Sequence, residues 1–244
     1  MRNKISLIQF LISLIIGIYV FIMILYIDIS SFSFYQFLFM TIWNCYISTI
    51  YFVIIAICDF SFYIYKSNKL EKINTIFREN LSPAFTALTY LVSFTFWVMI
   101  FPVIMKGKNE GEEYDVSLYI DLYVHLFLTI FQTIDIFLSY RENKGIVIKY
   151  DFLIASFIMG IYSILMLVLI FGFNIAIYPF LKNMTWYKGI GEILLFQLMI
   201  FIFYLIHVGL IKLKYKCKIF VLIDNNEEKK LSDNEQQAQI ESIN

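Results

Sequence analysis

One apolar stretch of this chain, residues 117–139, combines the length of a membrane-spanning helix with polar side chains that such a helix rarely carries. Four residues interrupt the stretch: Asp121, His125, Gln132 and Asp135. At 100° per residue, all four fall on one face of a helix. A charged residue at the bilayer centre costs about 2.5 to 3.5 kcal/mol, and residues of this kind usually serve a function. We therefore predict that this helix faces a site.

The rest of the chain predicts the kind of fold that holds this helix. Hydrophobic residues make up 60% of the sequence and the mean hydropathy is +0.75, which exceeds what a soluble core can bury. Five further apolar segments of spanning length stand at residues 5–27, 37–58, 84–105, 150–172 and 190–211. The predicted fold class is an all-α membrane protein, a bundle of six transmembrane helices formed by residues 1–223. Residues 224–244 are polar and lack aromatic side chains, so we expect a disordered cytosolic tail.

The distribution of basic residues predicts the orientation of the bundle. With six spans, fifteen of the nineteen Lys and Arg residues fall on one side of the membrane. Basic residues gather in cytosolic loops, so we expect both termini in the cytosol. The first segment is too long for the apolar region of a signal peptide and is expected to stay as a helix. The chain is thus predicted to be an integral multi-pass protein of an endomembrane or of the plasma membrane.

Charge and histidine content exclude several function classes. The net charge is zero, so the sequence offers no basic surface for nucleic acid; we expect membrane lipids as its surroundings and assign no oligomeric state. The two histidines, His125 and His207, are predicted to differ in depth by about 13 Å, at 1.5 Å per helical residue. Ligands of one metal ion or haem must converge on the iron or zinc centre. We therefore predict neither a metal site nor a cofactor.

A threonine on the second segment stands at a depth similar to that of His125. Thr41 is predicted to lie about 6 to 9 Å below the outer surface, and His125 about 12 Å. A hydroxyl with a histidine as general base is a nucleophile for esters. We expect the Thr41 hydroxyl and a His125 ring nitrogen within about 5 Å, in a pocket between segments 37–58 and 117–139. A hydrogen bond within or between helices is the alternative for each residue.

Two neighbours can support such a pair. Asp121, one turn before His125, can accept a hydrogen bond from the other ring nitrogen and fix its tautomer. Asn44, one turn after Thr41, can donate to an oxyanion. Ordinary interhelical hydrogen bonds are again the alternative for both.

Several short motifs, in order along the chain, resemble the androgen-induced protein family, which includes the androgen-dependent TFPI-regulating protein. The second segment contains FLFMTIWN followed by Asp59, and the third ends in Phe96-Trp97. The fourth has Asp121, His125 and Asp135 where the family has Asn, His and Glu at the same spacing. After the fifth segment comes IYPFL, similar to the family's aromatic-Tyr-Pro-Phe-Leu segment.

The resemblance implies a function as well as a fold. Members of that family are multi-pass membrane hydrolases of fatty acid esters of hydroxy fatty acids, with a Thr nucleophile and a His. These two map onto Thr41 and His125, and imply a lipid ester as the substrate. Three family residues near the histidine are replaced here, by Leu122, Leu126 and Ile130. These replacements bear on the choice of substrate rather than on the Thr and His roles.

Two other function classes remain open. The stripe of Asp121, His125 and Asp135 can line a transport path for protons or ions. A transport path needs polar residues through the full thickness of the membrane, with access from both sides. The chain can also be a catalytically inactive scaffold of the same fold, which the replacements around His125 favour.

Overall fold

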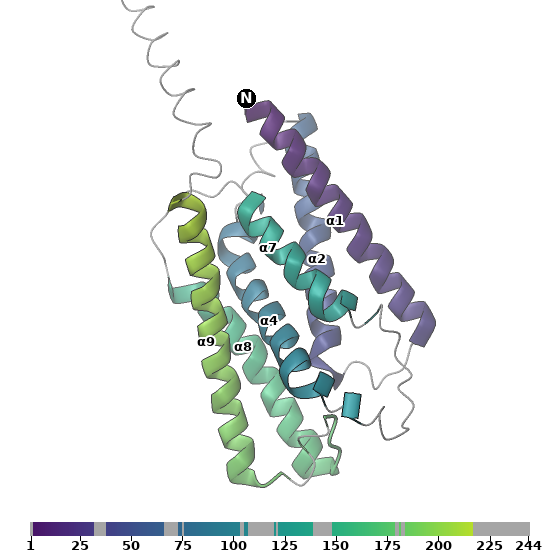
Figure 1. The fold of residues 1–244 in the computed structure, drawn as a ribbon, viewed down its shortest axis with the longest axis vertical. Helices are drawn as coiled ribbons and strands as arrows, with labels where there is room; N and C mark the ends of the chain where they lie inside the picture. Colours follow the sequence, from purple (N-terminus) through teal and green to yellow (C-terminus); the bar gives the residue numbers. More distant parts are fainter. Residues whose placement is uncertain are drawn as a thin grey trace, which may run out of the picture.

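The fold of the chain is seen in a computed structural model (Figure 1). It describes residues 2–31, 38–65, 73–74, 76–102, 105–106, 120, 122–138, 148–178, 181 and 184–216. Within these ranges the regular structure is helical, and no strand occurs. The predicted tail, residues 224–244, lies outside the described residues.

The first two helices form an antiparallel pair at one side of the bundle. They are α1 (Arg2–Ser31) and α2 (Met40–Tyr65). A Cβ atom at Gly17 would lie 3.0 Å from the Ala56 Cβ and 3.4 Å from the Phe52 carbonyl oxygen. Small residues let transmembrane helices approach closely, which is how these two pack.

The third spanning segment is the centre of the bundle. It runs without interruption through the π-helical turn η2 (Phe77–Leu81), α4 (Ser82–Thr95) and the π-helical turn η3 (Phe96–Ile100). Pro83 stands directly after the π-helical turn η2, and it has no N–H to donate to a carbonyl oxygen of that turn. Helix α4 contacts α2, α7, α8 and α9, and nearly all of its side chains are buried.

The remaining helices complete the bundle around α4. The π-helical turn η4 (Tyr123–Phe127) leads into α7 (Leu128–Leu138). Helix α8 (Ile148–Leu167) continues as η5 (Val168–Gly172), and α9 (Trp186–Lys216) ends the described chain. After η5 the backbone turns at Asn174, which has the left-handed φ of 56° that asparagine tolerates at helix ends.

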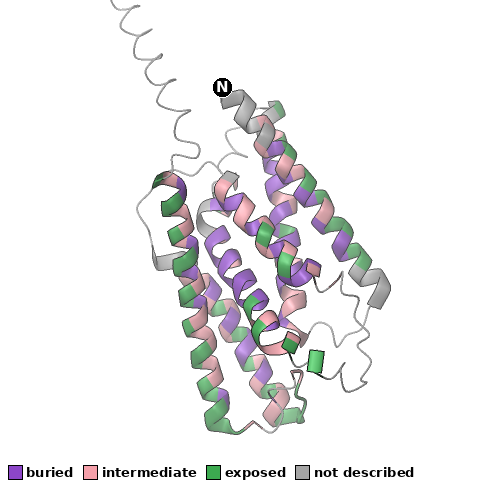
Figure 2. Cartoon of the chain, in the orientation of Figure 1, coloured by how far each residue is buried: buried purple, intermediate pink, exposed green. Residues whose placement is uncertain are grey.

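The outer surface of the bundle is apolar, as a membrane requires. Large hydrophobic side chains such as Ile15, Phe157 and Leu194 are about two-thirds exposed. Such residues cover the outward faces of α1, α8 and α9 (Figure 2). Water would drive these faces together, whereas lipid chains accept them. The chain is an integral membrane protein.

The number of apolar helices agrees with the predicted bundle in its main features. Five helices of the described chain are long enough to span a bilayer, and Tyr123–Phe137 forms a shorter apolar helix. The start of α1 and the end of α9 lie at the same end of the bundle (Figure 1). The exact number of spans and the side that faces the cytosol stay predictions.

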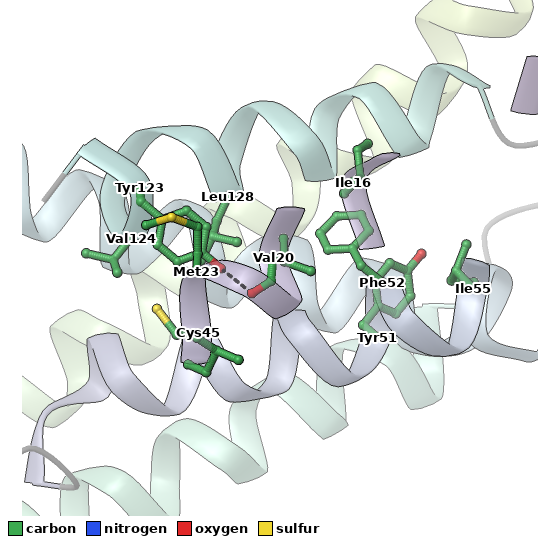
Figure 3. Close-up of a cluster of buried hydrophobic side chains, with 11 residues drawn as sticks. Ile16, Val20, Met23, Cys45, Tyr51, Phe52, Ile55, Tyr123, Val124 and Leu128 are labelled. Carbon is green, nitrogen blue, oxygen red and sulfur yellow. Dashed lines mark hydrogen bonds between the residues drawn. The ribbon is translucent and has the colours of Figure 1, made fainter. Parts of the chain in front are cut away.

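The interior contains two hydrophobic clusters. The first joins α1, α2 and η4, with Val20, Cys45, Phe52 and Tyr123 at its centre (Figure 3). In it the Tyr123 hydroxyl donates to the Val20 carbonyl oxygen at 3.4 Å. The second cluster joins α4, α8 and α9. Hydrogen-bonded polar side chains lie near both ends of the bundle, around Tyr162 at one end and around Arg78 at the other.

Candidate functional site

A cavity opens at the end of the bundle where α2 begins and α4 ends. It holds about 670 Å³ of space free of atoms, counting the part that is open to the outside. Its walls come from α2, α4, α8, α9 and the connection between the last two helices. Most of the wall is apolar, with a few polar side chains: Thr41, Thr95, Tyr162, Ser163, Tyr178 and Glu192. A largely apolar cavity with few polar groups is typical of a site for a lipid or another small ligand.

The predicted nucleophile, Thr41, lies in the first turn of α2 on the wall of this cavity. Two tyrosine hydroxyls satisfy the first backbone N–H of that turn, a group without a partner inside the helix. The Met40 N–H donates to the Tyr162 hydroxyl at 3.1 Å and to the Tyr178 hydroxyl at 3.3 Å. Tyr162 in turn donates to the Leu38 carbonyl oxygen at 3.0 Å. The tyrosine pair therefore fixes the helix end that carries Thr41.

The predicted base, His125, lies in η4 and is 4% exposed. Its imidazole stacks on the Phe96 ring, with 3.6 Å between centroids and 5° between planes. Its Nδ1 atom is buried and has no hydrogen-bond partner among the described residues. The Trp97 indole donates to the His125 carbonyl oxygen at 3.4 Å. Both stacked rings belong to π-helical turns, a backbone form often found at functional sites.

The geometry of α4 relates the two residues to each other. Thr89 donates to Asn44 at 2.8 Å, which fixes the register of α2 and α4. Thr41, three residues outward on α2, then stands level with Val92, and both line the cavity. His125 stands level with Phe96, four residues and about 6 Å further along α4. The depths of Thr41 and His125 thus differ by about one helical turn.

The cavity differs in position from the predicted pocket between segments 37–58 and 117–139. It lies between α2, α4, α8 and α9, and its wall includes no residue of η4 or α7. Thr95 belongs to the wall, whereas its neighbour Phe96 carries the stacked His125. Within the described chain, no hydrogen bond joins Thr41 to His125. The two residues therefore lie at the same end of the bundle, and only Thr41 lines the cavity.

The supporting residues have different outcomes. Asn44 is buried, and its side-chain oxygen accepts the Thr89 hydrogen bond while its Nδ2 has no partner among the described residues. Asp121 lies outside the described residues. The replaced positions Leu126 and Ile130 are 37% and 40% exposed. These two side chains face out of the bundle, so their replacement leaves the cavity unaltered.

Asp135 takes part in a second polar region, at the opposite end of the bundle. We call this region the arginine network; its members are Gln9, Ser13, Tyr51, Asp59, Asn74, Arg78 and Asp135. The Arg78 guanidinium donates to both carboxylate oxygens of Asp59, at 2.7 and 2.9 Å, and to Asp135 at 3.1 Å. The Tyr51 hydroxyl donates to the other Asp135 oxygen at 2.6 Å. Arg78, Asp59 and Asp135 are each at most 5% exposed, so the network ties α1, α2, η2 and α7 together.

The arginine network also limits the transport alternative. A proton path along the stripe of His125, Gln132 and Asp135 would need groups free to exchange partners. Asp135 is bound to Arg78 and Tyr51, and the Gln132 side-chain oxygen accepts from the Thr86 hydroxyl at 3.4 Å. The part of the stripe beyond His125 thus connects helices to one another.

Three residues of these regions were missed or misplaced by the sequence patterns. Arg78 counts as a loop cation in the basic-residue distribution, yet it is buried in the bundle. Glu192 and Ser163 line the cavity, and neither was predicted to do so. Glu192 carries a signal that could have found it, because a carboxylate at the edge of an apolar helix is as unusual as Asp121. A single serine on an apolar helix carries no such signal.

Comparison with known proteins identifies the family. Residues 5–214 match the model of the FAR-17a/AIG1-like protein family. This match covers most of the chain, and it confirms the resemblance to the androgen-induced family seen in the motifs. Neither a curated protein nor a solved structure gives a significant match. The chain belongs to the FAR-17a/AIG1-like family.

Proposed function

We propose that this member of the FAR-17a/AIG1-like family is an intramembrane threonine-type hydrolase of lipid esters. Thr41 is the nucleophile and His125 the general base. The observation that carries the proposal is the position of Thr41, a hydroxyl on the wall of a largely apolar cavity that reaches into a lipid-embedded bundle. An acyl chain fits the apolar wall, and its ester group then stands beside the hydroxyl.

The chemistry proceeds in two steps with a covalent intermediate. The Thr41 Oγ attacks the ester carbonyl carbon while His125 takes the hydroxyl proton. The tetrahedral intermediate collapses, the bond to the alcohol oxygen breaks, and the histidine returns the proton to that oxygen. Water then attacks the acyl-threonine, again with His125 as base, and releases the fatty acid. The resemblance implies fatty acid esters of hydroxy fatty acids as substrates of this reaction.

His125 has to approach Thr41 for this chemistry. In the structure its ring lies on Phe96, and the two residues differ in depth by about one helical turn. Because the His125 Nδ1 has no hydrogen-bond partner among the described residues, the ring can move without breaking a hydrogen bond at that atom. We therefore propose that substrate entry opens the Phe96 stack and lets the ring reach the hydroxyl. Contacts between catalytic groups are often loose without substrate and tighten in the complex.

The test is hydrolysis of a branched fatty ester by the purified protein in detergent. Thr41→Ala and His125→Ala should each lower the rate by at least about a thousandfold, and the double variant should be no slower, because both residues serve one step. Thr41→Ser keeps a hydroxyl and should keep part of the rate. Thr129→Ala is the matched control, since it makes the same substitution and removes a 2.9 Å hydrogen bond to Ser93, away from the cavity.

Two outcomes would contradict the proposal. If a folded Thr41→Ala variant hydrolyses the ester as fast as the parent, Thr41 is not the nucleophile. A parent protein without ester hydrolysis that moves protons or ions in liposomes would support the transport class instead.

A further inference from the structure

The polar side chains of the cavity suggest a class of ligand. We propose that the cavity binds an acyl ester of a neutral polyol, with the acyl chain along the apolar wall and the free hydroxyls at Glu192 and Ser163. This inference deepens the proposed function by naming a substrate class, and rests on that function for the hydrolytic step alone. It differs from the ester with a free carboxylate that the family resemblance implies.

The first observation is a set of polar atoms without partners. The Glu192 Oε2, the Ser163 Oγ and the Thr95 Oγ1 are buried, and none has a hydrogen-bond partner among the described residues. All three side chains line the cavity. A buried polar group without a partner costs about 1 to 3 kcal/mol, so native proteins usually satisfy such groups with a ligand or water. Three of them on one cavity wall indicate a ligand with several hydrogen-bonding groups.

The second observation is that Glu192 and Ser163 stand at the same level. Helices α8 and α9 run antiparallel, and a Cβ at Gly189 would touch Leu167 while one at Gly160 would touch Gln197. This register places residue 163 of α8 opposite residues 193 and 194 of α9, next to Glu192. Tyr162, next to Ser163, holds the first turn of α2, so Thr41 stands close to the same level. An ester carbonyl at Thr41 therefore has Glu192 and Ser163 on the wall of the same cavity, close to its own level.

The charge of the cavity wall determines which alcohol part of an ester can bind near Glu192. The cavity wall contains Glu192 but no lysine or arginine among its described residues. A substrate carboxylate close to the ester would face the Glu192 carboxylate, and none of the described wall residues is a cation that could offset the repulsion. Hydroxyl groups donate to a carboxylate and can both donate to and accept from Ser163. An ester of a neutral polyol, such as a monoacylglycerol, satisfies these atoms.

Three oleoyl esters that share one acyl chain test the proposal. They are 1-oleoylglycerol with a neutral diol, methyl oleate with no donor, and the oleoyl ester of glycolic acid with a carboxylate next to the ester. Binding is measured as the rise in Tm of the full-length Thr41→Ala protein in detergent, and hydrolysis is measured with the parent. Using the inert variant separates ligand choice from catalysis.

The parent should hydrolyse 1-oleoylglycerol about tenfold more efficiently than methyl oleate, since one or two hydrogen bonds to a charged group are gained. The glycolic ester should be the poorest substrate. Glu192→Leu should remove the preference for the diol, and Glu192→Gln should keep part of it while improving the glycolic ester. In the Thr41→Ala protein, 1-oleoylglycerol should give the largest rise in Tm, and Glu192→Leu should cancel the difference.

The failures of the two proposals are distinguishable. Binding of 1-oleoylglycerol that depends on Glu192, without hydrolysis by the parent, would overturn the hydrolase and retain the ligand class. Hydrolysis that depends on Thr41 but prefers the glycolic ester, or that ignores Glu192, would overturn the ligand class and retain the hydrolase.

Discussion

The two buried polar regions of this bundle differ in whether their buried polar atoms have hydrogen-bond partners. In the arginine network, each carboxylate meets a guanidinium and at least one neutral donor, and no side chain of the network leaves a buried atom without a partner. Around the cavity, Glu192, Ser163 and Thr95 leave buried atoms unsatisfied. The first region is complete within the chain, whereas the second is completed by something that enters it.

This difference separates residues that hold the fold from residues that await a ligand. An ionisable residue in a membrane is usually taken as a sign of function. Asp59, Asp135 and Arg78 show that such residues can also join helices, since their charges bind each other across three segments. Polarity alone is therefore not a criterion for a ligand site. Three pairs of substitutions test this contrast between the regions.

The largest effect is expected in the arginine network. Arg78→Met leaves two buried carboxylates without their cation, and should lower the free energy of unfolding by about 3 to 5 kcal/mol. Unfolding in mixed detergent micelles, followed by far-UV circular dichroism, measures this change. Arg78→Lys is the control; it keeps the charge but loses the two-pronged contact with Asp59, so its loss should be smaller. A Met variant as stable as the parent would show that the network adds nothing to the fold.

An intermediate effect is expected where a structural hydrogen bond supports the cavity. Tyr162→Phe removes the hydroxyl that binds the Met40 N–H and the Leu38 carbonyl oxygen, at a cost of about 1 kcal/mol. Because Thr41 follows Met40, ester hydrolysis should also fall, by roughly tenfold. Tyr90→Phe loses a comparable 2.7 Å bond, to Thr133, away from the cavity. The Tyr90→Phe variant should lose a similar amount of stability and should keep the parent's rate of ester hydrolysis. Equal hydrolysis rates for the two variants would exclude a positioning role for Tyr162.

The smallest effect is expected for a serine of the cavity, compared with one of the network. Ser163→Ala removes a buried hydroxyl without a partner and should therefore not lower the stability of the ligand-free protein. Ser13→Ala removes a 2.7 Å hydrogen bond to Asp59 and should cost about 1.5 to 3 kcal/mol. Equilibrium unfolding of the two variants gives both values. Equal losses would abolish the distinction between a satisfied and an unsatisfied region.

Hydrophobic runs were enough to predict the helices, because the length and apolarity of a span follow directly from the bilayer. Segments 37–58, 150–172 and 190–211 overlap α2, the α8–η5 helix and α9 closely. Arg78 was assigned to a loop because a charged residue inside a membrane is energetically costly. In the bundle Asp59 and Asp135 offset this cost, and both are distant from Arg78 in sequence. Pairing of that kind is a property of the packed bundle and leaves no local pattern.

The position of the cavity also could not be predicted from helical periodicity. A helical face drawn at 100° per residue assumes an unbroken α-helix across residues 117–139. The π-helical turn η4 holds more residues per turn, so His125 and Asp135 are out of α-helical phase with each other. His125 meets Phe96, while Asp135 meets Arg78 at the other end. The position of Thr41 could be predicted without helical periodicity, because this residue lies in the first turn of α2.

The tyrosine pair at the start of α2 gives the connection between α8 and α9 an influence on the chemistry. Tyr178 belongs to that connection, and its hydroxyl binds both Tyr162 and the backbone next to Thr41. A molecule that bound the connection and drew Tyr178 aside would loosen the first turn of α2 without touching the substrate. Conversely, a substrate that tightened this turn would hold the connection in place, because such coupling is reciprocal. The Tyr178 hydroxyl thus links the connection between α8 and α9 to the helix turn that carries Thr41.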